Sequence, residues 1–304
     1  MLLGTLIAVG GFSLAVSGQA PGPSAKAIAA TKIEKVKDNL YMITGSGVED
    51  TTAFSGGNVA VFITDGGVTL VDAKLPGFGP TIVDRVKSVT NKPITRIINT
   101  HTHSDHTGSN EFFGASIETI VQENTKANMV KMDEFKGAKA QFLPKKTYRE
   151  TLKVGAGKDE IDLYYFGPAH TNGDTFVVFP ALRTMHVGDV FAWKALPYVD
   201  DSNGGSVMQG SKTITTALDG VKNVDTIING HIPVSSWNDL KEYRDFLADF
   251  AAFAEKEMKA GKTADQAATE YKVAPKFKGY VASANPMFGG PKPNMEIAYK
   301  ELKK

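Results

Sequence analysis

The chain has 304 residues, which is long for one domain but possible for a large layered α/β fold, and its 42% hydrophobic and 22% charged residues are ordinary for a globular protein. Its 34 Lys and Arg residues almost balance its 33 Asp and Glu residues, which argues against nucleic acid or an acidic macromolecule as a partner. The chain contains no cysteine, and this excludes disulfide bonds, thiolate metal ligands and cysteine nucleophiles.

The first 25 residues carry no charged side chain, and residues 2–16 are mostly apolar. This stretch is shorter than the roughly 20 residues that a membrane-spanning helix needs. The tripeptide Gly-Gln-Ala at 18–20 resembles a signal-peptidase site, although no basic residues precede the apolar stretch. We therefore predict a signal peptide and linker over residues 1–30, export to the periplasm or the medium, and no stable membrane insertion afterwards. A weak membrane anchor or a disordered leader is the alternative.

Hydrophobic patterns predict a series of strands and helices in the rest of the chain. Strands are expected over residues 33–43, 58–64, 68–71, 94–98, 117–121, twice within 152–166, and over 176–179, 185–187 and 226–228. Helices are expected over residues 80–89, from 107 onward, and over 124–135, 211–221, 239–259 and 264–271. Loops are expected over residues 45–57, 136–150 and 191–210. This order favours stacked layers of helix and mixed sheet, in one domain over residues 31–304 with a C-terminal helical extension.

The segment after the strand 94–98 concentrates potential metal ligands. Within six positions it contains His101, His103, Asp105 and His106. Three imidazoles at this density would repel one another once protonated, and a cation that they and the carboxylate all ligate removes this conflict. Nitrogen and oxygen ligands without thiolate favour zinc, with iron or manganese as alternatives. A solvated polar loop is the alternative interpretation.

Three further potential ligands follow predicted strands, as the histidine segment does. They are His170, Asp189 and His231. Because a sheet holds the ends of its strands side by side, we expect these side chains to meet at one edge. His186 lies within a strand, where a single histidine is usually structural, and we assign it at most a contact to a metal ligand. Asp72 follows the second hairpin strand and is expected to hydrogen-bond the histidine segment rather than a metal.

The seven potential ligands form an ordered pattern: His101-x-His103-x-Asp105-His106, then His170, Asp189 and His231. This pattern, with Asp72 as an early acidic motif, resembles that of the metallo-β-lactamase superfamily over residues 31–260. The resemblance implies a four-layer αβ/βα sandwich with metals in a cleft at the edge of two sheets. It also implies that one metal is bound by His101, His103 and His170, and a second by Asp105, His106 and His231, with Asp189 bridging.

The resemblance further implies a dinuclear zinc-dependent hydrolase. A hydroxide that bridges two cations about 3.5–4 Å apart is a nucleophile at neutral pH, because coordination lowers the pKa of water towards roughly 7. Asp105 is the predicted catalytic residue, which orients the hydroxide and carries a proton to the leaving group. The expected partner is a small-molecule substrate, namely an ester, lactone, thioester or amide.

Differences among branches of the family narrow the substrate class. The absence of cysteine excludes the β-lactamases that have a cysteine at the second metal, and other di-zinc β-lactamases usually lack a carboxylate at the Asp189 position. A bridging Asp is more typical of lactonases, thioesterases and phosphoesterases, and His103 argues against the flavodiiron branch, which has Glu there. β-Lactam hydrolysis, a sulfur-dioxygenase-like mononuclear iron enzyme and a non-catalytic metal-binding accessory protein remain as alternatives.

Two loops are expected to determine the substrate, at residues 45–57 and 191–210. The second loop follows Asp189 and contains three side chains that we predict as substrate contacts, because functional residues concentrate on such loops. These are Trp193, Tyr198 and Asn203.

Overall fold

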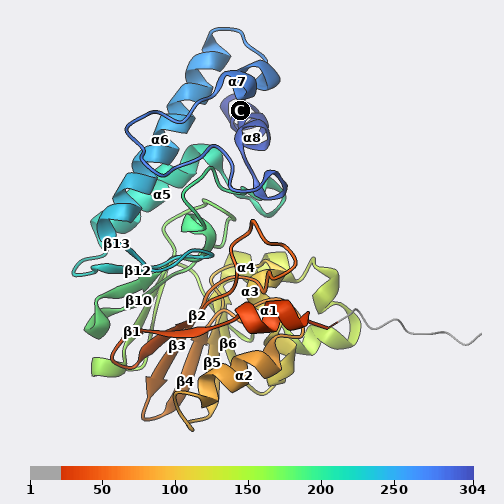
Figure 1. The fold of residues 1–304 in the computed structure, drawn as a ribbon, viewed down its shortest axis with the longest axis vertical. Coiled ribbons are helices and arrows are strands. Elements are labelled where there is room, and N and C mark those ends of the chain that lie inside the picture. The colour runs from red at the N-terminus through yellow and green to blue at the C-terminus, as the bar shows by residue number, and fades with distance from the viewer. Residues whose placement is uncertain (1–21) are drawn as a thin grey trace, which may run out of the picture.

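Two β-sheets packed face to face form the centre of the computed structural model, which describes residues 22–304 (Figure 1). Within these residues, the first sheet has seven strands in chain order: β1 (Ile33–Lys37), β2 (Leu40–Ile43), β3 (Val59–Thr64), β4 (Gly67–Val71), β5 (Ile94–Ile98), β6 (Glu118–Gln122) and β7 (Lys146–Tyr148). The second has six in the order β13-β12-β11-β10-β9-β8: β8 (Thr151–Val154), β9 (Ile161–Tyr164), β10 (Phe176–Phe179), β11 (Thr184–His186), β12 (Thr226–Ile228) and β13 (Ser235–Ser236). The predicted signal peptide over residues 1–20 lies outside the described part.

Helices cover the outer faces of both sheets. The α-helices are α1 (Ala25–Ala30), α2 (Gly79–Lys87), α3 (Ser104–Thr107), α4 (Glu123–Met129), α5 (Val207–Gly220), α6 (Trp237–Lys259), α7 (Ala264–Glu270) and α8 (Pro291–Leu302). Short 3₁₀ helices lie at Asn110–Phe113, Asp133–Phe135, Gly137–Phe142, Gly157–Asp159, Pro180–Leu182, Gly188–Phe191, Asp201–Asn203 and Pro286–Phe288. Across residues 22–304, every helix is too short or too polar to cross a membrane.

Apolar side chains fill the three spaces between these layers. Between the sheets, Phe62 of β3 packs against Phe179 of β10 with ring centroids 5.0 Å apart. On the outer face of the first sheet, Ile82 and Val86 of α2 are buried. On the outer face of the second sheet lie α5 and α6, on the side opposite α2 (Figure 1). The order of helix, sheet, sheet and helix confirms the predicted four-layer αβ/βα sandwich.

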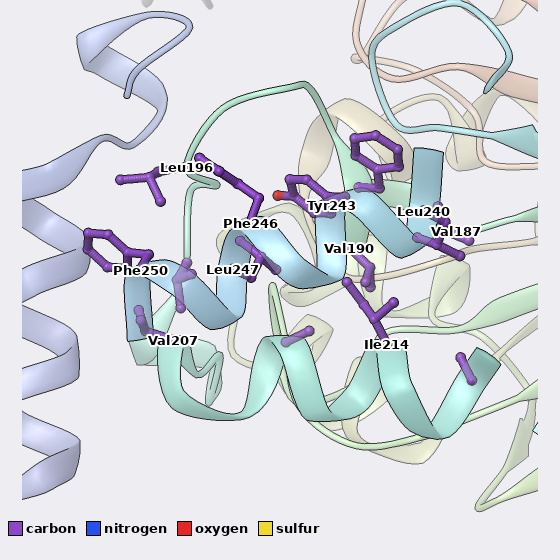
Figure 2. Packing of buried hydrophobic residues seen from close by; sticks show 14 of the residues in the cluster. Val187, Val190, Leu196, Val207, Ile214, Leu240, Tyr243, Phe246, Leu247 and Phe250 are labelled. Atoms are coloured by element: carbon purple, nitrogen blue, oxygen red, sulfur yellow. The ribbon is translucent and has the colours of Figure 1, made fainter. Parts of the chain in front are cut away.

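Helix α6 illustrates how the sequence specifies one of these layers. Ser236 and the side chain of Asp239 form a capping box, which satisfies two backbone N–H groups at the start of the helix. Leu240, Tyr243, Phe246, Leu247 and Phe250 then recur at helical spacing, and all are buried in one apolar cluster with residues of α5, such as Val207 and Ile214, and of other segments (Figure 2). Each large apolar side chain buried here contributes about 1.5–3 kcal/mol. This packing attaches α6 to the outer face of the second sheet.

Some local predictions were wrong. The segment 33–43 is not one strand, because the chain turns at Asp38 and Asn39 and β2 pairs antiparallel with β1. The helix expected from 107 onward begins earlier, at Ser104, and ends at Thr107. The part of the predicted linker over 25–30 is helix α1, whose first turn is capped by the side chain of Ser24.

Other predicted boundaries differ as well. The helix expected over 124–135 is divided into α4 and a 3₁₀ helix, and the predicted loop 136–150 contains the short edge strand β7. The proline- and glycine-rich end of the chain includes α8, which has prolines in its first turn where they cost no backbone hydrogen bond.

The directions of the strands explain how residues that are distant in the sequence reach the same end of the two sheets. In the first sheet β4 and β5 are parallel, so the residues after them, from Asp72 and from His101, leave the sheet at the same end. In the second sheet β11 and β12 are parallel, and β9 and β11 are both antiparallel to β10. The carboxyl ends of β9, β11 and β12 therefore also share one edge, and the chain after them carries His170, Asp189 and His231.

Candidate metal centre

The seven potential ligands lie together in two adjacent groups. The first group consists of His101, His103 and His170, and the second of Asp105, His106, Asp189 and His231. Within each group one nitrogen or oxygen atom of every residue lies within 4.8 Å of the corresponding atoms of the others. The structure thus brings together all seven potential ligands from the sequence, and it separates His101, His103 and His170 from the others, as the family resemblance implies.

In the first group each imidazole has one nitrogen held by the protein. His103 Nε2 lies 2.8 Å from Asp200 Oδ2, and His170 Nδ1 lies 2.7 Å from the carbonyl oxygen of Tyr198. His101 Nδ1 lies 3.0 Å from Thr100 Oγ1. These oxygen partners accept hydrogen bonds from the imidazoles, which places the proton of each ring on the nitrogen facing them. The other nitrogen of each ring is then an unprotonated acceptor.

In the second group the carboxylates of Asp105 and Asp189 contact both histidines. Asp105 Oδ2 lies 3.4 Å from His106 Nε2 and 3.3 Å from His231 Nε2. Asp189 Oδ1 lies 3.2 Å from His106 Nε2, while its Oδ2 lies 3.2 Å from His231 Nε2 and 3.7 Å from His170 Nε2. Asp189 therefore faces a histidine of each group.

The polar atoms of both groups fit a cation. Nδ1 of His103 and Nε2 of His170 lie 2.8 Å apart although the partners of these rings leave both nitrogens as acceptors. Among residues 22–304, His101 Nε2, His106 Nε2 and Asp189 Oδ1 are buried without a hydrogen-bond partner. Buried acceptors without partners are costly, and a shared cation satisfies them at once. Imidazole and carboxylate ligands without thiolate match zinc.

The electrostatics of the two groups differ. In the first, burial lowers the pKa of His170 to about 4, with the charge of His103 acting in the same direction. In the second, burial also disfavours the charged form of His231, but the carboxylates of Asp189 and Asp105 outweigh it and raise its pKa to about 9. A metal ion that binds the second group must therefore displace a proton, which makes its affinity depend on pH.

Asp72 supports ligands of both groups without belonging to either. It accepts hydrogen bonds from the backbone N–H and Oγ1 of Thr100, at 2.8 and 2.7 Å, and from Nδ1 of His106 at 2.7 Å. Thr100 Oγ1 in turn contacts His101. Asp72 has a left-handed backbone, with φ of +71°, which is rare for a residue with a side chain. The prediction that Asp72 hydrogen-bonds the histidine segment is confirmed.

His186 has a structural role. Its Nδ1 accepts a hydrogen bond from the backbone N–H of Gly188 at 3.0 Å, and its Nε2 lies 3.3 Å from the carbonyl oxygen of Asn58. Both contacts are to backbone groups near the site rather than to a ligand side chain.

Two buried charged residues at the site were missed by sequence reasoning. Asp200, which contacts His103, also accepts from Ser202 Oγ at 2.5 Å and from the backbone N–H of Asn203 at 3.1 Å. Its position before a short polar run indicated a turn but not a contact to His103. Lys74 is completely buried and donates to the carbonyl oxygen of Gly57 at 3.0 Å, and burial lowers its pKa to about 7. Nothing in the local pattern distinguishes it from a surface lysine.

A cavity of about 500 Å³ opens beside both groups. Ligands from each group reach its wall, and so do all three predicted substrate contacts: Trp193, Tyr198 and Asn203. Residues of the loops 45–57 and 191–210 both contribute to it. The cavity is therefore large enough for a small molecule next to the candidate ligands.

Comparison with known proteins identifies relatives. A family model described as "Metallo-beta-lactamase superfamily" matches residues 53–250. The metallo-beta-lactamase type 2 of Elizabethkingia meningoseptica is 29% identical over 160 residues, which are 51% of this chain and 59% of the relative. The 2,4-dinitroanisole O-demethylase subunit alpha of Nocardioides sp. (strain JS1661) is 30% identical over 177 residues, 57% of this chain and 50% of the relative. The chain thus spans between half and three fifths of the length of these two relatives.

A third relative is matched over more of its length. Metallo-beta-lactamase IND-1 of Chryseobacterium indologenes is 26% identical over 205 residues, 64% of this chain and 80% of the relative. Among solved structures, DIM-1 metallo-beta-lactamase aligns with a TM-score of 0.60 and 20% identity, over 72% of this chain and 97% of that chain. A metallo-beta-lactamase from Pontibacter korlensis aligns with a TM-score of 0.62 and 15% identity, over 72% and 99%. The structural similarities show the fold, and the family model shows that this chain belongs to the metallo-β-lactamase superfamily, a family of hydrolases.

Proposed function

We propose that this protein is a dinuclear zinc hydrolase that acts on a small ester, lactone, thioester or amide. The observation that carries the proposal is the position of Asp189, whose Oδ2 lies 3.2 Å from His231 and 3.7 Å from His170. A carboxylate that faces a histidine of each group suits two cations held side by side. His101, His103 and His170 would hold one ion, and Asp105, His106 and His231 the other. Iron or manganese could occupy the same ligands.

The metal ions, when bound, would polarise the scissile carbonyl group and lower the pKa of a coordinated water. The chain itself supplies proton handling. Asp105 and Asp189 both face the cavity, but the side chain of Asp105 is 20% exposed and that of Asp189 only 6%. Asp105 is therefore the carboxylate best placed to hold a proton at Oδ2 and deliver it to a leaving group.

The buried residues around the ligands keep them in place during this chemistry. Asp72 and Asp200 each fix an imidazole through the nitrogen that does not face the centre. Trp193, Tyr198 and Asn203 line the cavity, and we propose that they contact the substrate. Hydrogen bonds and ring contacts from these side chains would orient the scissile bond towards the ligands.

β-Lactam hydrolysis is the second candidate function. The names of two relatives, both metallo-beta-lactamases, favour it. The name of a third relative, an O-demethylase of 2,4-dinitroanisole, brings an aryl methyl ether into consideration as a substrate. A mononuclear iron oxygenase and a non-catalytic metal-binding protein are further alternatives.

Metal analysis combined with a substrate panel tests these functions. We expect two zinc ions per chain and turnover of an ester, thioester or lactone, in a panel that also includes a chromogenic β-lactam and a phosphodiester. Preferential β-lactam turnover would support the second candidate function instead. One iron per chain with oxygen consumption would support the oxygenase, and bound metal without turnover would support the accessory role.

We also propose that residues 31–304 form one domain and that the protein is exported. Contacts of α8 with α5 support the single domain, because the Glu301 carboxylate accepts hydrogen bonds from Ser206 Oγ at 2.6 Å and the backbone N–H of Val207 at 3.0 Å. Limited proteolysis should then yield no stable fragment that lacks α8. Export rests on residues 1–20, and sequencing the N-terminus of the mature protein would test it.

A further inference from the structure

Aromatic side chains from three distant segments form one wall of the cavity. Phe54 stacks on the ring of the candidate ligand His231 with centroids 5.5 Å apart, and Trp193 lies 5.6 Å from the same ring. Phe288 lies 5.9 Å from Phe54 and 6.3 Å from Trp193. We call these three side chains the aromatic wall; two of them, Phe54 and Trp193, pack against His231.

The C-terminal part of the aromatic wall is fixed to the rest of the site. Phe288 lies outside residues 53–250, the range that the family model matches. Asn285 Nδ2 donates to the carbonyl oxygen of Val48 at 2.9 Å. The backbone N–H of Val281 donates to the carbonyl oxygen of Lys194 at 3.0 Å. The segment therefore contacts both loops that border the cavity, and Phe288 is held in place from two sides.

Acidic and apolar side chains, but no lysine or arginine of residues 22–304, line the cavity. Among the described residues that line it, the side chains with a permanent charge are Asp105, Asp189 and Asp200, and none is Lys or Arg. Two lysines in neighbouring segments are engaged elsewhere. Lys194 lies 2.8 Å from Asp239, and Lys74 is buried against the carbonyl oxygen of Gly57.

Loading the site with metal does not create a surplus of positive charge. Asp72, Asp105, Asp189 and Asp200 lie at or next to the ligands, and their four charges balance those of two divalent cations. A substrate carboxylate would therefore lose its hydration in this cavity without gaining a cationic side chain. An uncharged aromatic or alkyl group would instead gain contact with the aromatic wall.

We propose that the cavity selects neutral substrates with an aromatic or alkyl group near the scissile bond, and that Phe54, Trp193 and Phe288 determine this selectivity. The inference deepens the proposed function and rests on it for the reaction, but the preference of the cavity for neutral ligands can be measured separately. It disfavours β-lactams, because penicillins and cephalosporins carry a carboxylate beside the ring.

A matched pair of substrates tests the selectivity in turnover. 4-Nitrophenyl butyrate and mono-4-nitrophenyl succinate share the leaving group and the length of the acyl chain, and differ in a terminal methyl or carboxylate group. We expect kcat/KM of the zinc-loaded protein to be at least about tenfold higher for the butyrate. This is the order of magnitude that the loss of one buried charge-assisted contact produces.

Binding without turnover tests the aromatic wall. The chain has two tryptophans, so in a Trp237→Phe background the fluorescence reports on Trp193 alone. The ligands are neutral 4-nitrobenzamide and anionic 4-nitrobenzenesulfonate, a poor metal ligand, and both quench indole fluorescence. We expect the amide to bind more tightly, and its Kd to rise about five- to tenfold in Phe54→Ala and Phe288→Ala. Phe112→Ala, at a phenylalanine that is 49% exposed and outside the cavity, is the matched control.

The outcomes separate this inference from the proposed function. Equal or higher kcat/KM for the succinate would overturn the inference, and so would an unchanged Kd of the amide in both alanine variants that keep the wild-type unfolding temperature. If one variant fails to fold, Phe288→Leu tests the ring while it preserves apolar volume. Preferential binding of the amide without turnover of either ester would refute the proposed hydrolase and still support the selectivity of the cavity.

Discussion

Nδ1 of His106 lies 2.7 Å from Oδ2 of Asp72, and both side chains are completely buried. The contact fixes the orientation of the His106 ring and directs its Nε2 towards Asp105 and Asp189. Through Thr100, the same carboxylate also holds His101 of the other group. One residue outside both groups of potential ligands thus orients members of each group.

Asp72→Asn should weaken metal binding while it preserves the size of the side chain. The amide cannot accept hydrogen bonds at both of its terminal atoms, so it must give up a contact to Thr100 or to His106. We expect the apparent affinity for zinc to fall about 10- to 100-fold, as is common when the partner of a ligating histidine is removed. Competition with a chromophoric chelator measures this affinity, and an affinity equal to that of the wild type would contradict the role of Asp72.

Asp200→Asn should affect only the group that contains His103. Asp200 contacts Nε2 of His103, and in the described structure it has no contact with a histidine of the second group. We expect one of the two zinc ions to be lost at a lower chelator concentration than in the wild type. Asp201→Asn is the control, because Asp201 forms a surface ion pair with Lys300 and such pairs contribute little. Equal losses in both variants would show that Asp200 has no special function.

Asp105→Asn and His103→Ala should each abolish turnover, for different reasons. Asp105 is assigned to proton transfer and to the second metal, so its amide should lower kcat at least about 100-fold. His103→Ala removes a ligand, so the zinc content per chain should also fall. Asp65→Asn, at a carboxylate whose side chain is 85% exposed, is the control. Full activity in either variant would contradict the role assigned to the residue that it replaces.

Gly230→Ala should disturb Asp189 without removing any functional group. A Cβ atom at Gly230 would lie 2.0 Å from Asp189 Oδ1, too close for any packing to tolerate, so the carboxylate would have to move. We expect at least about a tenfold loss of kcat, since small displacements of positioned groups are costly. At Gly66 the nearest atom to a new Cβ, Thr64 Oγ1, is 3.8 Å away, so Gly66→Ala should retain activity. Similar kinetics for the two variants would argue against close packing at Gly230.

Lys74 should make stability depend on pH in a defined range. Burial lowers its pKa from 10.5 to about 7, so between these values the unfolded state holds a proton that the folded state has lost. Stability relative to Lys74→Met should therefore rise with pH between about 7 and 10, by at most about 1.4 kcal/mol per pH unit, and stay constant below this range. Urea unfolding of both proteins at several pH values measures the difference. If the two proteins differ in free energy of unfolding by the same amount at every pH, Lys74 stays charged in the folded protein.

The sequence by itself determined the helices and strands that depend on local patterns. Amphipathic spacing predicted α6, and apolar runs predicted β3, β4 and β5. Such patterns are visible because an element that buries one face has apolar residues at regular intervals in its sequence. The types and order of the potential ligands were also local, so the histidine segment and its partners after later strands could be found without a structure. The hairpin within 33–43 was missed, because a turn of two polar residues interrupts the alternation without changing its period.

Only the tertiary structure decided which side chains surround the ligands. Asp200 reaches His103 from 97 positions away, and Phe288 completes the aromatic wall from the far end of the chain. Lys74 is buried although it is a lysine, because the loop that contains Gly57 folds over it. Such contacts depend on how loops pack against one another. Loop packing follows no sequence period. The potential ligands could therefore be found in the sequence, but the residues that hold them in place and shape the cavity could not.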